Sequence, residues 1–98
     1  MEKLHSNETD ELFRAILSLA TVEECYAFFE DACTVREIRE IARRFKVARL
    51  LSEGANYAEI EQKTEMSTAT ISRVSRCLEY GSGGYRTVLD RLKEAGSK

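Results

Sequence analysis

Apolar side chains recur at intervals of three and four residues along most of the chain, a spacing that places them on one face of an α-helix. Proline is absent, and the glycines lie between these stretches or in the tail, as expected for helices joined by short turns. The pattern predicts an all-α fold of six helices. Their expected ranges are 8–20, 22–32, 35–53, 57–64, 68–80 and 85–95.

Three of these helices have a clear start signal. Thr21, Thr34 and Asn56 each stand three residues before a glutamate, which is the spacing of a capping box. In a capping box the two side chains accept hydrogen bonds from backbone N–H groups that the helix leaves unpaired. Gly54 and Gly81 are placed where they would end the helices before them.

The predicted helix over 35–53 is apolar over a wide arc in its second half, which indicates contact from several sides. We expect inward positions at Ile41 in this helix and at Tyr85, Val88 and Leu92 in the last one. Six short helices in 98 residues supply little core. We therefore expect a second copy of the chain to contribute burial.

The segment 56–80 predicts a helix-turn-helix. Ser67 is expected to cap its second helix, and Met66 and Ile71 stand where a hydrophobic staple would fix the entry of the chain. The inward line of this helix is expected at Ile71, Val74, Ser75 and Leu78. The outward line is expected at Thr68, Ala69, Ser72, Arg73 and Arg76.

The outward line carries short or basic side chains and no acid, as a helix that enters a DNA major groove requires. Hydroxyl groups and N-terminal amides can bind phosphates, and arginine can bind guanine through two hydrogen bonds. An amphipathic hairpin with a polar outer face is the plainer interpretation. The predicted DNA-contacting residues are Asn56, Ser67, Thr68, Ala69, Thr70, Ser72, Arg73 and Arg76.

A second basic feature lies in the predicted helix over 35–53. Arg39, Arg43 and Lys46 stand at i, i+4 and i+7 and would form one exposed basic ridge. Beside a recognition helix, such a ridge would contact phosphates, which position a protein on DNA without specifying sequence. A solvated helix face is the alternative interpretation.

The net charge of −2 is unevenly distributed along the chain. Residues 1–34 hold two basic and eight acidic side chains, a net of −6, whereas residues 35–98 hold thirteen basic and nine acidic side chains, a net of +4. Since the local potential attracts a polyanion, this asymmetry permits DNA binding despite the negative total.

Several functional classes find no support in the sequence. Three cysteines and one histidine show no metal-ligand spacing, so no metal site is expected and the thiols are expected to be reduced. The sequence contains no acid–base pair, activated nucleophile or phosphate loop, so it gives no indication of an enzyme. No apolar run reaches the ~18–20 residues of a membrane helix, and the start is unlike a secretory signal. We expect a cytoplasmic protein without a membrane partner.

The stretch Met66-Ser67-Thr68-Ala69-Thr70-Ile71-Ser72-Arg73, after an arginine-rich helix, resembles the Trp repressor-like family, and most closely its TrpR-related YerC/YecD group. The resemblance covers about 8–96 and is sharpest over 69–73. It implies a bacterial transcriptional repressor that forms an intertwined homodimer. Residues 8–53 and 84–96 would then be the dimerisation core, and 56–80 would read DNA.

The resemblance also implies an effector pocket. By position, Arg44 and Arg73 match two arginines of the family's corepressor site, and Val74 stands where the family has glycine. The isopropyl group of Val74 would intrude where an indole stacks, which argues against tryptophan. No cofactor is expected, and a different small-molecule corepressor, or none, remains open.

Taken together, the sequence predicts a single domain over 1–98, with a frayed terminus over 1–7. Its predicted function is that of a sequence-specific, double-stranded DNA-binding regulator acting as a homodimer. The alternative is a protein-interaction module of the same fold that binds no DNA. Glu65 and Glu61 depart from the usual helix-turn-helix pattern, since the first position usually holds glycine and the second a small residue.

Overall fold

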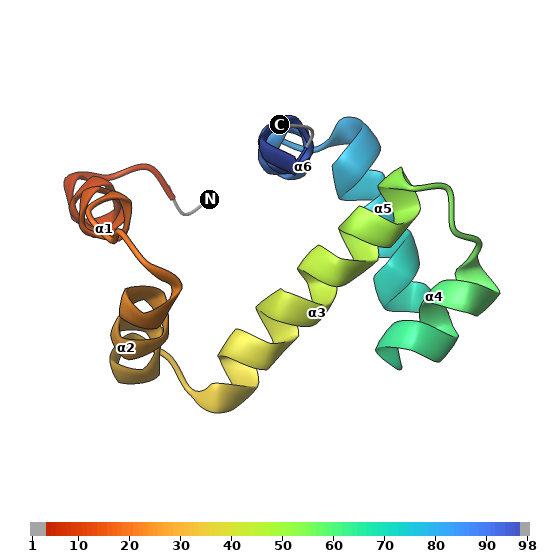
Figure 1. Cartoon of the computed structure of the whole chain (residues 1–98), viewed down its shortest axis with the longest axis horizontal. Coiled ribbons are helices and arrows are strands. Elements are labelled where there is room, and N and C mark those ends of the chain that lie inside the picture. The colour runs from red at the N-terminus through yellow and green to blue at the C-terminus, as the bar shows by residue number, and fades with distance from the viewer. Residues whose placement is uncertain (1–3, 97–98) are drawn as a thin grey trace. The chain divides into compact units, whose positions relative to one another are not determined.

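The computed structural model describes residues 4–96, which form six helices and no strand (Figure 1). The all-α fold predicted from the sequence is therefore confirmed. The helices are α1 (Asn7–Leu17), α2 (Val22–Ala32), α3 (Val35–Ser52), α4 (Tyr57–Thr64), α5 (Thr68–Tyr80) and α6 (Gly84–Gly96).

The first helix differs most from its predicted range. It ends at Leu17 rather than at residue 20, because the Ser18 hydroxyl donates to the Ala15 carbonyl oxygen (2.6 Å) and closes the last turn. Its start is also earlier, since the Ser6 side chain accepts a hydrogen bond from the Thr9 N–H (3.1 Å). The predicted frayed terminus over 1–7 is thus too long at its end, and residues 1–3 lie outside the described residues.

The predicted capping boxes form, with one variation. Thr34 and Glu37 pair reciprocally, and the Thr34 N–H bond to the Glu37 carboxylate (2.8 Å) lowers the pKa of that carboxyl. Asn56 and Glu59 also pair reciprocally. At α2, the Glu24 N–H donates to the Thr21 hydroxyl oxygen as expected. The Glu24 carboxylate, however, accepts from the N–H of the residue before Thr21.

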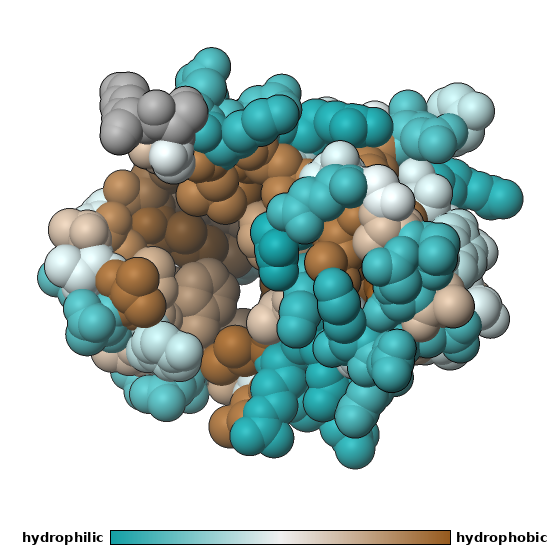
Figure 2. Space-filling model, turned by 45° about the vertical axis from the view of Figure 1, so that its right-hand side comes forward, coloured by the Kyte–Doolittle hydropathy of each residue, from teal (hydrophilic) through white to brown (hydrophobic). Residues whose placement is uncertain are grey.

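Residue contacts divide the chain into two compact units, one ending at Ile38 and one beginning at Arg39. The length had led us to expect one domain. In the first unit, α1 and α2 contain no buried residue. Phe13 is 50% exposed and Leu17 is 82% exposed. Figure 2 shows hydrophobic side chains, in brown, on the surface of the molecule. The apolar faces of α1 and α2 are thus left largely uncovered.

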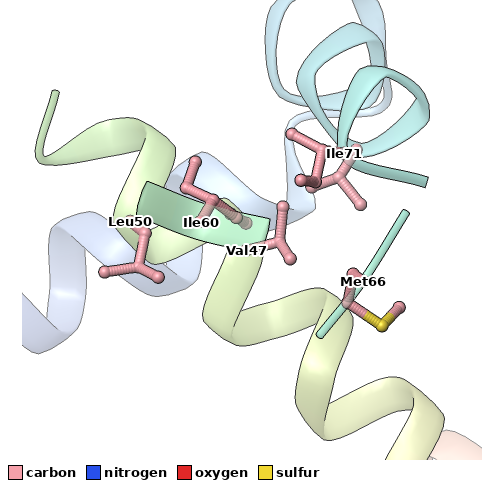
Figure 3. Close-up of a cluster of buried hydrophobic side chains, with 7 residues drawn as sticks. Val47, Leu50, Ile60, Met66 and Ile71 are labelled. Atoms are coloured by element: carbon pink, nitrogen blue, oxygen red, sulfur yellow. The ribbon is translucent and has the colours of Figure 1, made fainter. Parts of the chain in front are cut away.

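The core of the second unit joins the carboxyl-terminal half of α3 to the helix-turn-helix (Figures 1 and 3). Val47 from α3, Ile60 from α4 and Ile71 from α5 have no exposed surface. Complete burial of a side chain of this size contributes about 1.5–3 kcal/mol. The other members of the cluster are Ala48, Leu50, Met66 and Val74, with Leu51, Ala55, Tyr85 and Leu89 packed against it. Burial of both Met66 and Ile71 agrees with the predicted staple.

The turn between α4 and α5 contains a strained residue. Glu65 has φ 59° and ψ 22°, the left-handed conformation, and it is the one residue other than glycine with positive φ among residues 4–96. The turn is held by hydrogen bonds on both sides: the Glu65 N–H donates to the Glu61 carbonyl (2.8 Å), and the Met66 N–H donates to the buried Thr64 hydroxyl oxygen (3.2 Å). Glu65 therefore adopts the left-handed conformation in which a residue with a side chain carries a steric cost, as predicted.

We predict that Glu65→Gly stabilises the protein, because glycine adopts the left-handed conformation without steric penalty. The free energy of unfolding should rise by about 1 kcal/mol. Glu61→Gly is the matched control: it makes the same substitution inside α4, where glycine costs about 1 kcal/mol. Urea denaturation of both variants should give midpoints on opposite sides of the parent, and a lower midpoint for Glu65→Gly would contradict the strain.

Candidate nucleic-acid interface

Helix α5 has two distinct faces. Ile71, Val74 and Leu78 are buried against the core, as the sequence predicted. The residues predicted to point outward are all exposed: Thr68, Ala69, Ser72, Arg73 and Arg76. Four of them form a continuous stripe and line a hollow of about 230 Å³: Ala69, Ser72, Arg73 and Arg76. We call these four residues the recognition face.

The start of α5 is organised by Ser67. The Ser67 hydroxyl oxygen accepts from the Thr70 N–H (3.2 Å) and also forms a hydrogen bond with the Thr70 hydroxyl (3.2 Å). Thr70 is half-buried, so its hydroxyl serves the cap rather than an exposed surface. Thr68 stays exposed at the first position of the helix. Of the predicted hydroxyl contacts, Thr68 and Ser72 are therefore the most accessible.

Asn56, also predicted to contact DNA, caps α4. Its side-chain oxygen accepts from the Glu59 N–H (2.9 Å), and its own N–H donates to the Glu59 carboxylate (3.1 Å). The amide nitrogen of the side chain remains as a donor group. Asn56 can thus offer its side-chain NH2 group to a phosphate while it holds the start of α4.

The cations divide into paired and unpaired sets. Arg44 pairs with Glu40 (3.5 Å) and Arg49 with Glu53 (3.3 Å), both across one turn of α3. Among residues 4–96, no ion pair involves the two arginines of the recognition face or the basic ridge of Arg39, Arg43 and Lys46. The three residues of the ridge are exposed. The cations predicted to bind DNA are therefore among the basic residues of this part of the chain that form no ion pair, a group that also includes Arg14, Arg36 and Lys63.

The three residues of the implied effector pocket do not meet in this chain. Val74 is 3% exposed and belongs to the core. Arg73 lines the hollow on the recognition face. Arg44 lines a different cavity, an apolar groove of about 630 Å³. Within residues 4–96, Arg44 and Arg73 thus line two different cavities, and Val74 lines neither of them.

The apolar groove was not predicted as a cavity. It lies in the second unit, among α3, the end of α5 and the start of α6. Its lining consists of Ile41, Arg44, Phe45, Cys77, Gly81, Ser82, Gly84, Tyr85 and Val88. Ile41 is 57% and Val88 45% exposed, although both were predicted to be buried; Leu92 of the last helix is likewise exposed. Partial burial, with a smaller effect of Cys77, raises the pKa of Tyr85, and Arg44 opposes this shift.

Within residues 4–96, no three histidine, cysteine or acidic side chains come together as ligands for a metal ion. None of the described helices combines the length and the apolar character needed to cross a membrane. The recognition face and the basic ridge are thus the candidate site that the structure offers.

These features define a helical protein with a helix-turn-helix, in which a turn of three residues joins α4 to α5. The family model described as Trp repressor protein matches residues 7–93. The chain therefore belongs to the Trp repressor family, which confirms the resemblance predicted from the sequence. The fold is that of a family of DNA-binding regulators and not of an enzyme family.

Relatives agree with this assignment over nearly the full length. The chain is 55% identical over 94 residues to YerC of Bacillus subtilis (strain 168), which is itself described as uncharacterized; the match covers 96% of this chain and 90% of YerC. A TrpR-like protein from Eubacterium eligens ATCC 27750 has a similar structure, with a TM-score of 0.89, 50% identity, and coverage of 92% of this chain and 93% of that one. A candidate Trp repressor from Staphylococcus aureus also has a similar structure, with a TM-score of 0.88 and 50% identity. The match covers 92% of this chain and 90% of that one.

The separation of the two faces of α5 predicts a contrast between neighbouring residues. Arg73→Ala removes an exposed side chain without an ion pair and should change the free energy of unfolding by less than about 0.5 kcal/mol. Val74→Ala removes two buried methyl groups and should lower it by about 2 kcal/mol. Urea denaturation checks both values. If Arg73→Ala proved as costly as Val74→Ala, Arg73 would have a structural role.

Proposed function

We propose that the protein is a sequence-specific DNA-binding transcriptional regulator, a repressor, which acts as a homodimer. One observation carries the proposal: α5 buries one face against the core and exposes another that, over residues 68–76, carries short or basic side chains and no acid. A helix with this surface can enter a major groove, because small side chains let its backbone approach the bases. The recognition face and the exposed Thr68 are proposed to bind DNA directly, and Ser67 and Thr70, whose side chains form the cap of α5, are proposed to hold the backbone N–H groups of its first turn toward a phosphate.

The basic ridge of Arg39, Arg43 and Lys46 is proposed to bind phosphates. Its side chains are exposed and unpaired, so they reach a phosphate without first breaking an ion pair. Phosphate contacts of this kind fix the register of a protein on the duplex, and the recognition helix then selects the sequence. Asn56 contributes a further donor at the start of α4. We also propose that the protein acts in the bacterial cytoplasm, where chromosomal DNA lies.

A second copy of the chain is proposed to cover the exposed apolar surface. The helices α1, α2 and α6 bury no residue, and large apolar side chains are left exposed in both units, among them Leu17, Tyr26 and Ile41. Burial of such side chains between two copies would supply the core that each copy lacks. In the proposed dimer the two α5 helices would lie about 34 Å apart, which is the spacing of successive major grooves.

Tryptophan is not part of the proposal. The isopropyl group of Val74 occupies the core, and Arg44 and Arg73 line separate surfaces of the chain. An effector that both arginines hold would need a cavity built with the second copy. The proposed repressor is accordingly expected to bind its operator at full affinity without tryptophan.

DNA binding is tested with a duplex selected from a randomised library by the full-length protein. Arg73→Ala and Arg76→Ala should each weaken binding to the selected duplex by about tenfold, since a bidentate arginine–guanine pair supplies about 1–3 kcal/mol of discrimination. Lys46→Ala should weaken all duplexes alike and reduce the slope of log affinity against log salt by about one. Arg14→Ala, an exposed arginine of α1, is the control and should change neither quantity.

Duplex selection and the salt dependence of affinity also decide between the two candidate functions. A protein-interaction module is favoured by the acidic residues 1–34, which carry a net charge of −6. Such a module would select no duplex and would show no steep salt dependence. Failure to select a duplex, or an affinity that does not fall with salt, would overturn the proposal of DNA binding.

Homodimer formation is tested by sedimentation of two charge variants. Ile41→Glu places a charge on a residue that is 57% exposed in the single chain, so a monomer tolerates it and a buried interface does not. We expect this variant to sediment as a monomer at micromolar concentration. Ser72→Glu, on the recognition face, should remain dimeric and lose DNA binding. A parent protein that sediments as a monomer would refute the dimer.

A further inference from the structure

The recognition face combines short and long side chains. Ala69 and Ser72, one turn apart, are short, whereas the neighbouring Arg73 and Arg76 are long. Together the four side chains line the hollow of about 230 Å³. All four residues are exposed, and nothing from the core side of α5 enters the hollow. Ala69 contributes a methyl group, Ser72 a hydroxyl group and the arginines two guanidinium groups. The hollow therefore offers one apolar contact surrounded mainly by hydrogen-bond donors.

The four bases differ in how well they fit this set of groups. In the major groove, thymine presents a C5-methyl group beside the O4 acceptor, and guanine presents the N7 and O6 acceptors. Cytosine presents an amino donor that is best bound by a carboxylate, and adenine is best bound by the amide of Asn or Gln. The recognition face contains neither a carboxylate nor an amide. Its chemistry thus favours thymine and guanine over the other two bases.

We propose that the hollow reads a thymine next to a guanine in each half of the operator. The thymine methyl group packs against the Ala69 side chain, Ser72 donates to thymine O4, and Arg73 or Arg76 binds the N7 and O6 atoms of the guanine. This assignment rests on the proposed DNA binding and specifies which bases the site selects.

The arginines are free for this role. Glu79 is the one acidic residue of α5, and it forms no ion pair with Arg76 in the described chain. Both guanidinium groups therefore keep all their donors for the bases. The first turn of α5 likewise contains no acid that would repel phosphates or accept from cytosine.

The experiment begins with the selected duplex and then removes single methyl groups from it. Each thymine of the half-site is replaced in turn by deoxyuridine, which lacks only the C5-methyl group. Loss of one buried methyl group is worth about 0.8 kcal/mol, or about fourfold in affinity. We expect this loss at one thymine that neighbours a guanine.

A matched pair of protein variants assigns the methyl contact to Ala69. Ala69→Gly removes the methyl group in the hollow, so the fourfold difference between thymine and uracil should fall to about one. Ala58→Gly is the control, because Ala58 is exposed and holds the same second position in α4 that Ala69 holds in α5. It carries the same helix penalty and should keep the fourfold difference. Circular dichroism confirms that both variants fold.

Each outcome has a distinct meaning. A thymine-specific loss that Ala69→Gly abolishes and Ala58→Gly keeps supports the assignment. A selected duplex that binds equally well with uracil at every thymine overturns the assignment and leaves DNA binding intact, as does a methyl effect that Ala69→Gly does not change. Failure to select any duplex overturns the proposed function itself.

Discussion

The packing of α4 and α5 against the end of α3 is the constraint on which the candidate site depends. Val47, Ile60 and Ile71 come from three different helices and are completely buried together. Because α5 makes this contact through Ile71 and Val74, its opposite face must point to solvent. The orientation of the recognition face is thus set by apolar burial and not by any polar interaction of its own.

Local signals allowed much of this arrangement to be predicted from the sequence. The spacing of apolar residues in α5 predicted both of its faces. The capping box of Asn56 predicted the start of α4, and the absence of the usual glycine predicted strain at Glu65. Each of these features depends on residues within one or two helical turns. The family resemblance, carried mainly by residues 69–73, was confirmed over residues 7–93.

Features that depend on contacts between distant residues were harder to predict. Apolar periodicity places Ile41 and Val88 on inward faces, but it does not say what covers them, and in one copy they border an open groove. The early end of α1 coincides with a tight last turn, in which the hydroxyl and the N–H of Ser18 both donate to the Ala15 carbonyl oxygen. Sequence position brought Arg44, Arg73 and Val74 together as one pocket, whereas the fold assigns them to three surroundings.

The recognition face supports little of the fold, since its residues bury no core surface and hold no ion pair. Substitutions there escape the structural selection that acts on Ile71 and Val74. Relatives that share half of their residues with this chain can therefore keep one architecture and still differ in the side chains of this face. The same independence makes positions 69, 72, 73 and 76 suitable for redesign, because the proposed DNA specificity could be changed there by exchanging four side chains without altering the core.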